Sequence, residues 1–381
     1  MVRLYLKEVN MYKIIAEKLF DGKKILEDRV ILFERGKIIH IGEDTKDKVS
    51  KTHMAKFVTP GFIDLASGIG LREESLGRIE GVDLNEETNP QTPELVALDG
   101  INPYDESFKK SIRGGVTMSL VLAGISNTIG GRGSLIWNVG DNILDMTIKS
   151  PFGMRFSLNN EPKFVYMKQK KMPMTRMGNA YLIREALSRA KEYKKSKKKF
   201  SLFEESLLPI VSGKDRAFLS SFRADDIMTG LRISDEFELN SVITNGFEAD
   251  LLIDEIKKRK IPVAFGPIIL SRESRELSHL SPEVPVALIE NGIETAIISG
   301  HPLFPAEFLR IQAGLLIREG LKREKALATI TSVPAKILGM ESFGSIKEGK
   351  DCTLTIFDGD PWETKTQAKK VFINGKEVYF S

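Results

Sequence analysis

The two ends of the chain share one pattern, in which short apolar runs alternate with turn residues. Turns are indicated by Asp21-Gly22 and Arg35-Gly36 near the N-terminus, and Asn374-Gly375 near the C-terminus is a strong hairpin signal. The runs are residues 11–19, 29–33, 37–41, 353–357, 370–373 and 377–380. Because neither end can bury an apolar face alone, we predict one β-sandwich domain built from residues 1–56 and 345–381.

Between the two ends, amphipathic helical segments alternate with short apolar strands. The predicted helices are residues 105–113, 224–238, 248–259 and 284–291, and the strands that follow them are residues 116–122, 241–244, 262–265 and 294–298. This alternation is typical of a parallel α/β sheet, and so many units favour closure into a barrel. We therefore predict that residues 57–344 form a (β/α)8 TIM barrel.

Composition excludes several classes of protein. The 381 residues include 41% hydrophobic residues, which is ordinary for a chain with a sizeable core, and no apolar run approaches the roughly 18 residues of a membrane span. The first residues carry charges where an export signal needs an apolar run. The single cysteine, Cys352, fits a reducing compartment. These features predict a cytoplasmic protein that does not bind a membrane.

The net charge of +4 is modest, and lysines gather only at residues 191–199. They follow a helical pattern over residues 181–193 and lack the interleaved aromatic residues of a nucleic-acid platform. We therefore interpret this segment as a solvated loop after a helix and expect no binding of nucleic acid.

Several motifs occur in the order found in one known family. The main segments are Val58-Thr59-Pro60-Gly61-Phe62-Ile63-Asp64, Ser126-Asn127-Thr128-Ile129-Gly130-Gly131-Arg132-Gly133, Pro334-Ala335-Lys336-Ile337-Leu338-Gly339 and Gly344-Ser345-Ile346-Lys347-Glu348-Gly349-Lys350-Asp351. Shorter segments that resemble motifs of the same family occur at residues 175–178 and 223–227. The chain thereby resembles the amidohydrolase superfamily, in its imidazolonepropionase-related branch. The resemblance implies a barrel that hydrolyses C–N or related bonds with one or two divalent metal ions.

The positions that resemble the family's metal ligands hold other residues in this chain. The residues at these positions are Ala66, Gly68, Asn160, Ser220, Phe222, Asn245 and Gly300. The chain has four histidines, His40, His53, His279 and His301, and no two of them are two residues apart. Methyl, hydrogen, hydroxymethyl and phenyl groups cannot replace imidazole as metal ligands. We therefore predict that the metal site is lost and that the protein uses no cofactor.

His301 is the remaining candidate for catalysis, because it follows the eighth predicted strand and could face the barrel mouth. The alternative is a hydrogen-bonded turn residue before Pro302. Nominal carboxylate candidates for a replacement site have ordinary structural explanations, such as surface pairing or helix N-termini. These carboxylates are Asp64, Glu73, Glu74, Asp83, Asp225 and Asp226.

Other residues could form a ligand pocket. Asn127, Gly130, Gly131 and Arg132 form a glycine-rich segment that we expect to be a turn, whose amides could hold an anion. The remaining ligand-binding candidates are Arg176, Arg223 and Asn245. The alternative is that all of them stabilise loops and helix ends. Trp137 suggests that an apolar side chain refills the pocket.

The sequence thus predicts an amidohydrolase-type protein without metal-dependent activity. It would bind a small molecule, or serve as a structural or regulatory partner of another chain or of a second copy in a homodimer. The alternative is an active hydrolase of a small cyclic amide or similar substrate, with a rebuilt site around His301.

Overall fold

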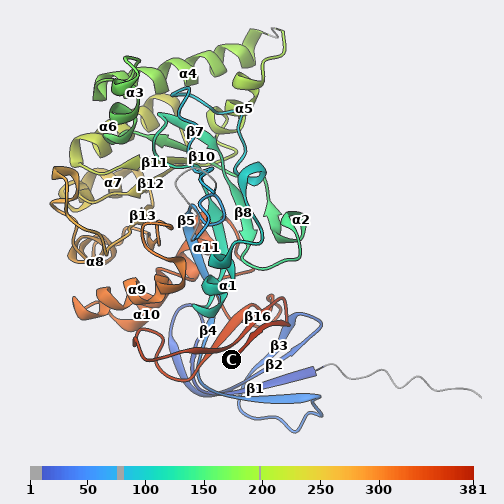
Figure 1. Ribbon diagram of the computed structural model, residues 1–381. Helices are drawn as coiled ribbons and strands as arrows, with labels where there is room; N and C mark the ends of the chain where they lie inside the picture. The colour runs from blue at the N-terminus through green and yellow to red at the C-terminus, as the bar shows by residue number, and fades with distance from the viewer. Residues whose placement is uncertain (1–10, 75–80, 197–198) are drawn as a thin grey trace, which may run out of the picture.

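Three β-sheets organise the protein (Figure 1). The computed structural model describes residues 11–74, 81–196 and 199–381. One sheet contains strands from both ends of the chain and lies at the bottom of Figure 1. The other two sheets and most of the helices lie above it.

The terminal sheet has seven strands and one parallel pair, β1 with β4. Its order is β17 (Lys376–Phe380), β16 (Ala368–Ile373), β15 (Leu354–Phe357), β4 (Lys51–Pro60), β1 (Met11–Phe20), β2 (Ile25–Glu34) and β3 (Lys37–Gly42). The sheet is curled, since Phe33 of β2 and Phe372 of β16 pack edge to face with ring centroids 5.4 Å apart. Strand β4 runs through the boundary that we predicted between residues 56 and 57.

The central part contains a six-stranded and a four-stranded sheet. The first has the order β14 (Thr295–Ile297), β13 (Val263–Phe265), β12 (Ser241–Asn245), β11 (Ala217–Ser221), β10 (Met154–Ser157) and β7 (Ile129–Arg132). The second has the order β5 (Phe62–Ser67), β6 (Val116–Val121), β8 (Ser134–Trp137) and β9 (Thr147–Lys149). Strands β10 to β14 are mutually parallel, as are β5 and β6.

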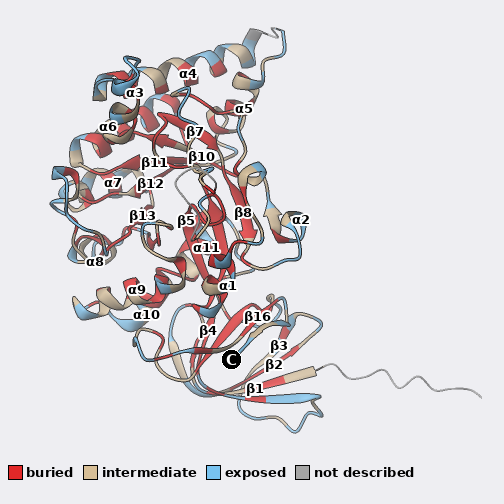
Figure 2. Ribbon diagram, in the orientation of Figure 1, coloured by how far each residue is buried: buried red, intermediate tan, exposed pale blue. Residues whose placement is uncertain are grey.

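Helices flank these sheets, and their exposed faces point outward while the strands are buried (Figure 2). The α-helices are α1 (Glu106–Arg113), α2 (Ile143–Met146), α3 (Glu161–Lys168), α4 (Arg176–Ser196), α5 (Leu202–Val211), α6 (Ala224–Phe237), α7 (Ile253–Arg259), α8 (Glu283–Glu290), α9 (Leu309–Arg318), α10 (Arg323–Ala328) and α11 (Ser332–Leu338). Short 3₁₀ helices are η1 (Ala97–Gly100), η2 (Ala249–Leu252), η3 (Arg275–Leu277) and η4 (Ala306–Phe308).

Helix α1 illustrates how local sequence sets these elements. Asp105 caps its first turn by accepting a hydrogen bond from the Ser107 amide, and Phe108 and Ile112 bury its apolar face. Gly114 ends the helix, where a Cβ would come within 2.2 Å of the Glu307 carbonyl oxygen. The close approach of this backbone segment therefore requires glycine.

One apolar cluster is shared by the two central sheets. Leu65 and Met118 contribute to it from the four-stranded sheet, and Phe218, Val242 and Ala296 contribute from the six-stranded sheet. Side chains that alternate along each strand therefore meet in one core.

The lysine segment that we expected to be a loop begins inside α4, which extends to Ser196, while Lys197 and Lys198 lie outside the described residues. Among the described residues, none of the helices is long and apolar enough to cross a bilayer.

Candidate functional site

A cavity of about 390 Å³ opens where the parallel strands of both central sheets end. We call it the His301 cavity. It is lined by Ala66, Ser67, Gly68, Arg72, Leu84, Asn85, Gly124, Ile125, Ser126, Arg155, Glu161, Phe222, Asn245, Phe247, Pro267, Leu270, Leu277, Ile298, Gly300, His301, Pro302 and Leu303. Carboxyl ends of parallel strands are where α/β folds place their ligands, so this cavity is the principal candidate site.

The structure brings together most positions that resemble metal ligands. Ala66, Gly68, Phe222, Asn245 and Gly300 all line the cavity. The other two positions, Ser220 and Asn160, do not line it: Ser220 donates a hydrogen bond to the Asn245 side chain, and Asn160 lies in the turn before α3. Across residues 11–74, 81–196 and 199–381, no group of three or more His, Cys, Asp or Glu side chains is placed to hold a metal ion.

At two of these positions, the surrounding atoms leave no room for a side chain. A Cβ on Gly68 would lie 2.8 Å from the His301 carbonyl oxygen, which accepts a hydrogen bond from the Gly68 amide. Gly300 has a φ of +62°, and a Cβ there would lie 2.6 Å from Cδ of Pro267. Ligand side chains at these positions would therefore require the backbone to move. The residues present do not fit the divalent ions that the family uses.

His301 is only 7% exposed and lines the cavity. Its backbone forms a hydrogen-bonded turn, as our alternative expected, because the His301 amide donates to Ser299 Oγ and the His301 carbonyl accepts from the Gly68 amide. Within the described part of the chain, neither of its ring nitrogens has a hydrogen-bond partner. Burial lowers the pKa of His301, with smaller opposing effects from Asp105 and Glu74. The ring is therefore a neutral imidazole at neutral pH, with one nitrogen to donate and one to accept.

A buried carboxyl group supports the backbone beneath His301. Asp64 of β5 is fully buried and accepts hydrogen bonds from the amide and hydroxyl of Ser299, which follows β14. Ser299 Oγ in turn accepts from the His301 amide at 3.0 Å. Burial raises the pKa of Asp64 to about 6, although the Ser299 hydrogen bonds lower it. Asp64 therefore joins the two central sheets and does not itself line the cavity.

Sequence reasoning missed two charged residues of the cavity, Arg155 and Glu161. Arg155 of β10 pairs in register with Phe218, so its side chain projects from the core side of the sheet. Burial lowers the pKa of Arg155 to about 10. Burial also raises the pKa of Glu161, with a further contribution from Glu87. The burial of the Arg155 position is set by tertiary packing, so the local pattern of β10 carried no signal for it.

A second cavity, of about 410 Å³, adjoins the first through Leu84, Asn85 and Gly124. Asn127, Gly130 and Gly131 line it. We call it the Asn127 cavity. The acidic residues Asp83, Glu86 and Asp99 also line it, which disfavours an anion. The Asn127 side chain donates to Glu86 O and Thr92 Oγ1 and accepts from the buried Tyr166 hydroxyl at 2.6 Å.

The glycine-rich segment is strand β7 where we predicted a turn. The amides of Ile129 and Arg132 donate to the carbonyls of Pro90 and Leu95. A Cβ on Gly131 would lie 2.9 Å from Leu95 O, so glycine permits this close approach. The Arg132 guanidinium donates to Glu94 O at 3.4 Å, and Arg132 lines neither cavity. Trp137 does not refill the site: its ring packs against Phe343.

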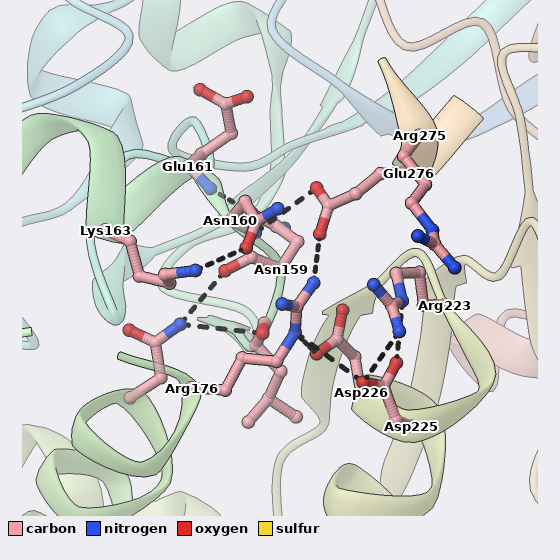
Figure 3. A network of polar contacts seen from close by, with 12 residues as sticks. Asn159, Asn160, Glu161, Lys163, Arg176, Arg223, Asp225, Asp226, Arg275 and Glu276 are labelled. Atoms are coloured by element: carbon pink, nitrogen blue, oxygen red, sulfur yellow. Dashed lines mark hydrogen bonds and ion pairs between the residues drawn. The ribbon is translucent and has the colours of Figure 1, made fainter. Parts of the chain in front are cut away.

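Arg176 and Arg223 belong to a polar network beside the His301 cavity (Figure 3). Arg176 donates to Asp226 and to Glu276, each at 2.6 Å, and both carboxylates are almost fully buried. Arg223 forms two hydrogen bonds to Asp225. Burial raises the pKa of both Asp226 and Glu276, an effect that Arg176 opposes. Both arginines are therefore occupied by carboxylates of the same chain.

Asn159, which is labelled in Figure 3, connects the network to the cavity through Ser220 and Asn245. Asn159 Nδ2 donates to Ser220 Oγ at 3.0 Å, and Ser220 donates to Asn245 Oδ1 at 2.8 Å. Asn245 has a φ of +71° and donates to Gly266 O. These bonds fix the ends of β10, β11 and β12. Of the remaining acids, Glu74 pairs with Lys110.

The chain matches a family model described as the amidohydrolase family over residues 298–379. A crystal structure of an amidohydrolase from Thermotoga maritima is 35% identical, with a TM-score of 0.94, over 97% of this chain and 100% of that one. The amidohydrolase tasK of Hapsidospora irregularis is 25% identical over 91% of this chain, which spans 39% of the length of that relative. The ochratoxinase of A. niger, 13% identical with a TM-score of 0.60 over 98% of this chain and 97% of that one, shares the fold.

Proposed function

Because this chain belongs to the amidohydrolase superfamily, we propose that it is a member that binds a small molecule in the His301 cavity and has lost metal-dependent hydrolysis of C–N bonds. One observation carries this proposal. The ligand positions Ala66, Gly68 and Gly300 surround a cavity lined by His301, a buried side chain whose ring nitrogens have no partner among the described residues. Unpartnered polar groups in a cavity are the groups that a ligand would satisfy.

We also propose that the two central sheets close into one barrel and that the chain belongs to the imidazolonepropionase-related branch. The core shared by the central sheets and the Asp64–Ser299 hydrogen bonds support their closure into one (β/α)8 barrel. The motifs at residues 58–64 and 126–133 support placement in the imidazolonepropionase-related branch.

Metal content tests the loss of hydrolysis. The protein is purified without chelator, challenged with zinc and manganese, desalted, and measured by inductively coupled plasma mass spectrometry. We expect far less than one ion per chain, because the cavity offers His301 as its only imidazole among the described residues. One tightly held ion per chain together with amide hydrolysis that chelator abolishes would contradict the proposal.

Ligand-observed NMR tests the binding cavity with 3-phenylpropionamide, a neutral compound with an apolar body. We expect saturation transfer from the wild-type protein. Ile125→Trp, which fills the cavity, should abolish it, whereas Met54→Trp on the exposed face of the terminal sheet should not. Equal transfer from all three proteins would place the compound outside the cavity and contradict the proposal.

A second function is favoured by His301 itself. Its neutral, unpartnered imidazole could act as a general base in a metal-independent hydrolase. This alternative predicts hydrolysis of small cyclic amides that persists in chelator and is lost in His301→Gln. His279→Gln is the matched control, since His279 is exposed and hydrogen-bonds to Asp250. Hydrolysis that is equal in both variants, or absent from the wild type, would dismiss this alternative.

A further inference from the structure

Arg155 is a cation with no counter-charge among residues 11–74, 81–196 and 199–381. Its Nη1 donates to the Ala123 carbonyl oxygen at 2.8 Å, and its Nε is buried without a partner. None of the ion pairs that the described residues form includes Arg155, and burial is the sole cause of its lowered pKa. A guanidinium has five N–H donors, so most of those on Arg155 are free.

This arrangement is unfavourable for folding. Arg155 is half-buried, and a charge that is partly removed from water without a counter-charge opposes folding, so proteins ordinarily pair such charges. Arg176, in the neighbouring polar network, follows that rule with two carboxylates. Since Arg155 lines the His301 cavity, a ligand placed there could supply the missing negative charge.

The other groups of the cavity limit the charge of such a ligand. Arg72 lies at the exposed rim, and Glu161 is the one carboxylate among the described lining residues. A single negative charge would balance Arg155, whereas a doubly charged phosphate would add repulsion from Glu161. A carboxylate also matches the planar fork of a guanidinium.

The other residues that line the cavity indicate the chemistry of the rest of the ligand. Phe222, Phe247, Leu270 and Leu277 offer apolar contact, and the neutral His301 lines the cavity beside them. We propose that the His301 cavity binds a small organic monocarboxylic acid, with its carboxylate on Arg155 and its apolar body against these four side chains. This inference rests on the proposed binding function and names its ligand class.

The test compares three compounds that share a phenyl group: 3-phenylpropionate, 3-phenylpropionamide and 2-phenylethyl phosphate. Their affinities for the full chain are measured by ligand-observed NMR titration. We expect the acid to bind about 10- to 100-fold more tightly than the amide, because hydrogen bonds to charged groups are the stronger ones. We also expect the phosphate to bind more weakly than the acid.

Variants assign this preference to Arg155. Arg155→Met should bind acid and amide equally, and Arg155→Lys should restore part of the difference. Arg216→Met is the matched control, because Arg216 hydrogen-bonds to Asn240 and lines a different hollow. It should keep the wild-type preference. The comparison of acid with amide on the wild-type protein needs no variant, so it holds even where Arg155→Met does not fold.

The outcomes separate this inference from the proposed function. Amide binding as tight as acid binding would overturn the inference and leave a binding cavity in place. A preference for the acid that survives in Arg155→Met, or tighter binding of the phosphate, would also overturn it. No binding of any compound at millimolar concentration would contradict the proposed function together with the inference.

Discussion

Two neighbouring regions of this protein each contain an arginine, and the two arginines differ in whether carboxylates pair with them. In the polar network of Figure 3, Arg176 is held between Asp226 and Glu276. In the His301 cavity, Arg155 has one backbone carbonyl as its partner and no carboxylate among the described residues. The two regions are joined through Asn159 and Ser220, so they belong to one framework.

The difference separates structural from functional polar groups. A paired buried charge stabilises one arrangement of loops, and loss of either partner leaves the other charge uncompensated. An unpaired charge opposes folding and is available to a ligand. The family resemblance pointed to Arg176, whereas the unsatisfied hydrogen-bonding groups point to Arg155 and His301.

The paired arginine should give the largest effect on stability. Arg176→Met leaves Asp226 and Glu276 buried without a cation, so we expect the free energy of unfolding to fall by about 3–5 kcal/mol. Urea denaturation measures the change. Arg223→Met is the control, because its partner Asp225 is half exposed and such pairs contribute up to about 1 kcal/mol. Equal losses in the two variants would contradict the distinction.

Asp64 should have the next largest effect on the free energy of unfolding, and this effect should depend on pH. Its pKa in the folded protein, about 6, lies above the ordinary value of 3.8 for this group. The neutral carboxyl therefore stabilises the folded state fully below pH 3.8, and this contribution is lost as the pH rises through 6. Between these limits the loss is about 3 kcal/mol.

Asp64→Asn should remove this dependence. We expect the unfolding free energy of the wild type, relative to the variant, to fall as the pH rises from 4 to 7 in urea denaturation. Ser299→Ala removes the hydroxyl hydrogen bond that lowers the pKa of Asp64 and keeps the amide hydrogen bond, so the fall should move to higher pH. A difference that stays constant with pH would show that Asp64 is ionised throughout.

Arg155 should respond in the opposite direction to Arg176. In protein without ligand, Arg155→Met removes an unpaired, half-buried charge and keeps much of its volume, so we expect the unfolding free energy to rise by about 1 kcal/mol. The gain should shrink when 3-phenylpropionate is added, because a ligand that binds only the folded state stabilises the wild type. A loss of stability without ligand would indicate a counter-charge within the protein.

The sequence predicted much of the framework. The alternating runs at both ends are strands of one sheet, and the helices predicted at residues 105–113 and 224–238 match α1 and α6. The motifs also located Ala66, Gly68, Asn245 and His301 at one cavity, because the ends of parallel strands converge in space.

Arg155 was not predictable from its local pattern. In β10, Met154 and Phe156 alternate with Arg155 and Ser157, which is typical of a strand with one solvated face. Both faces of this parallel sheet are covered, so the polar alternation points into the core. Only the tertiary structure explains a polar residue on a buried face of the sheet, because it shows that Arg155 lines the cavity.

His301 gives the smallest predicted change and completes the contrast with the network. Since neither ring nitrogen has a partner among the described residues, His301→Leu removes no hydrogen bond of the side chain. It replaces a buried polar ring with an apolar group, so we expect the unfolding free energy to change by less than about 1 kcal/mol. Asn127→Leu is the comparison, because it leaves the buried Tyr166 hydroxyl without its acceptor and should cost about 1–3 kcal/mol. If His301→Leu proved as destabilising as Asn127→Leu, His301 would be a structural residue, and its place in the cavity would no longer favour a ligand.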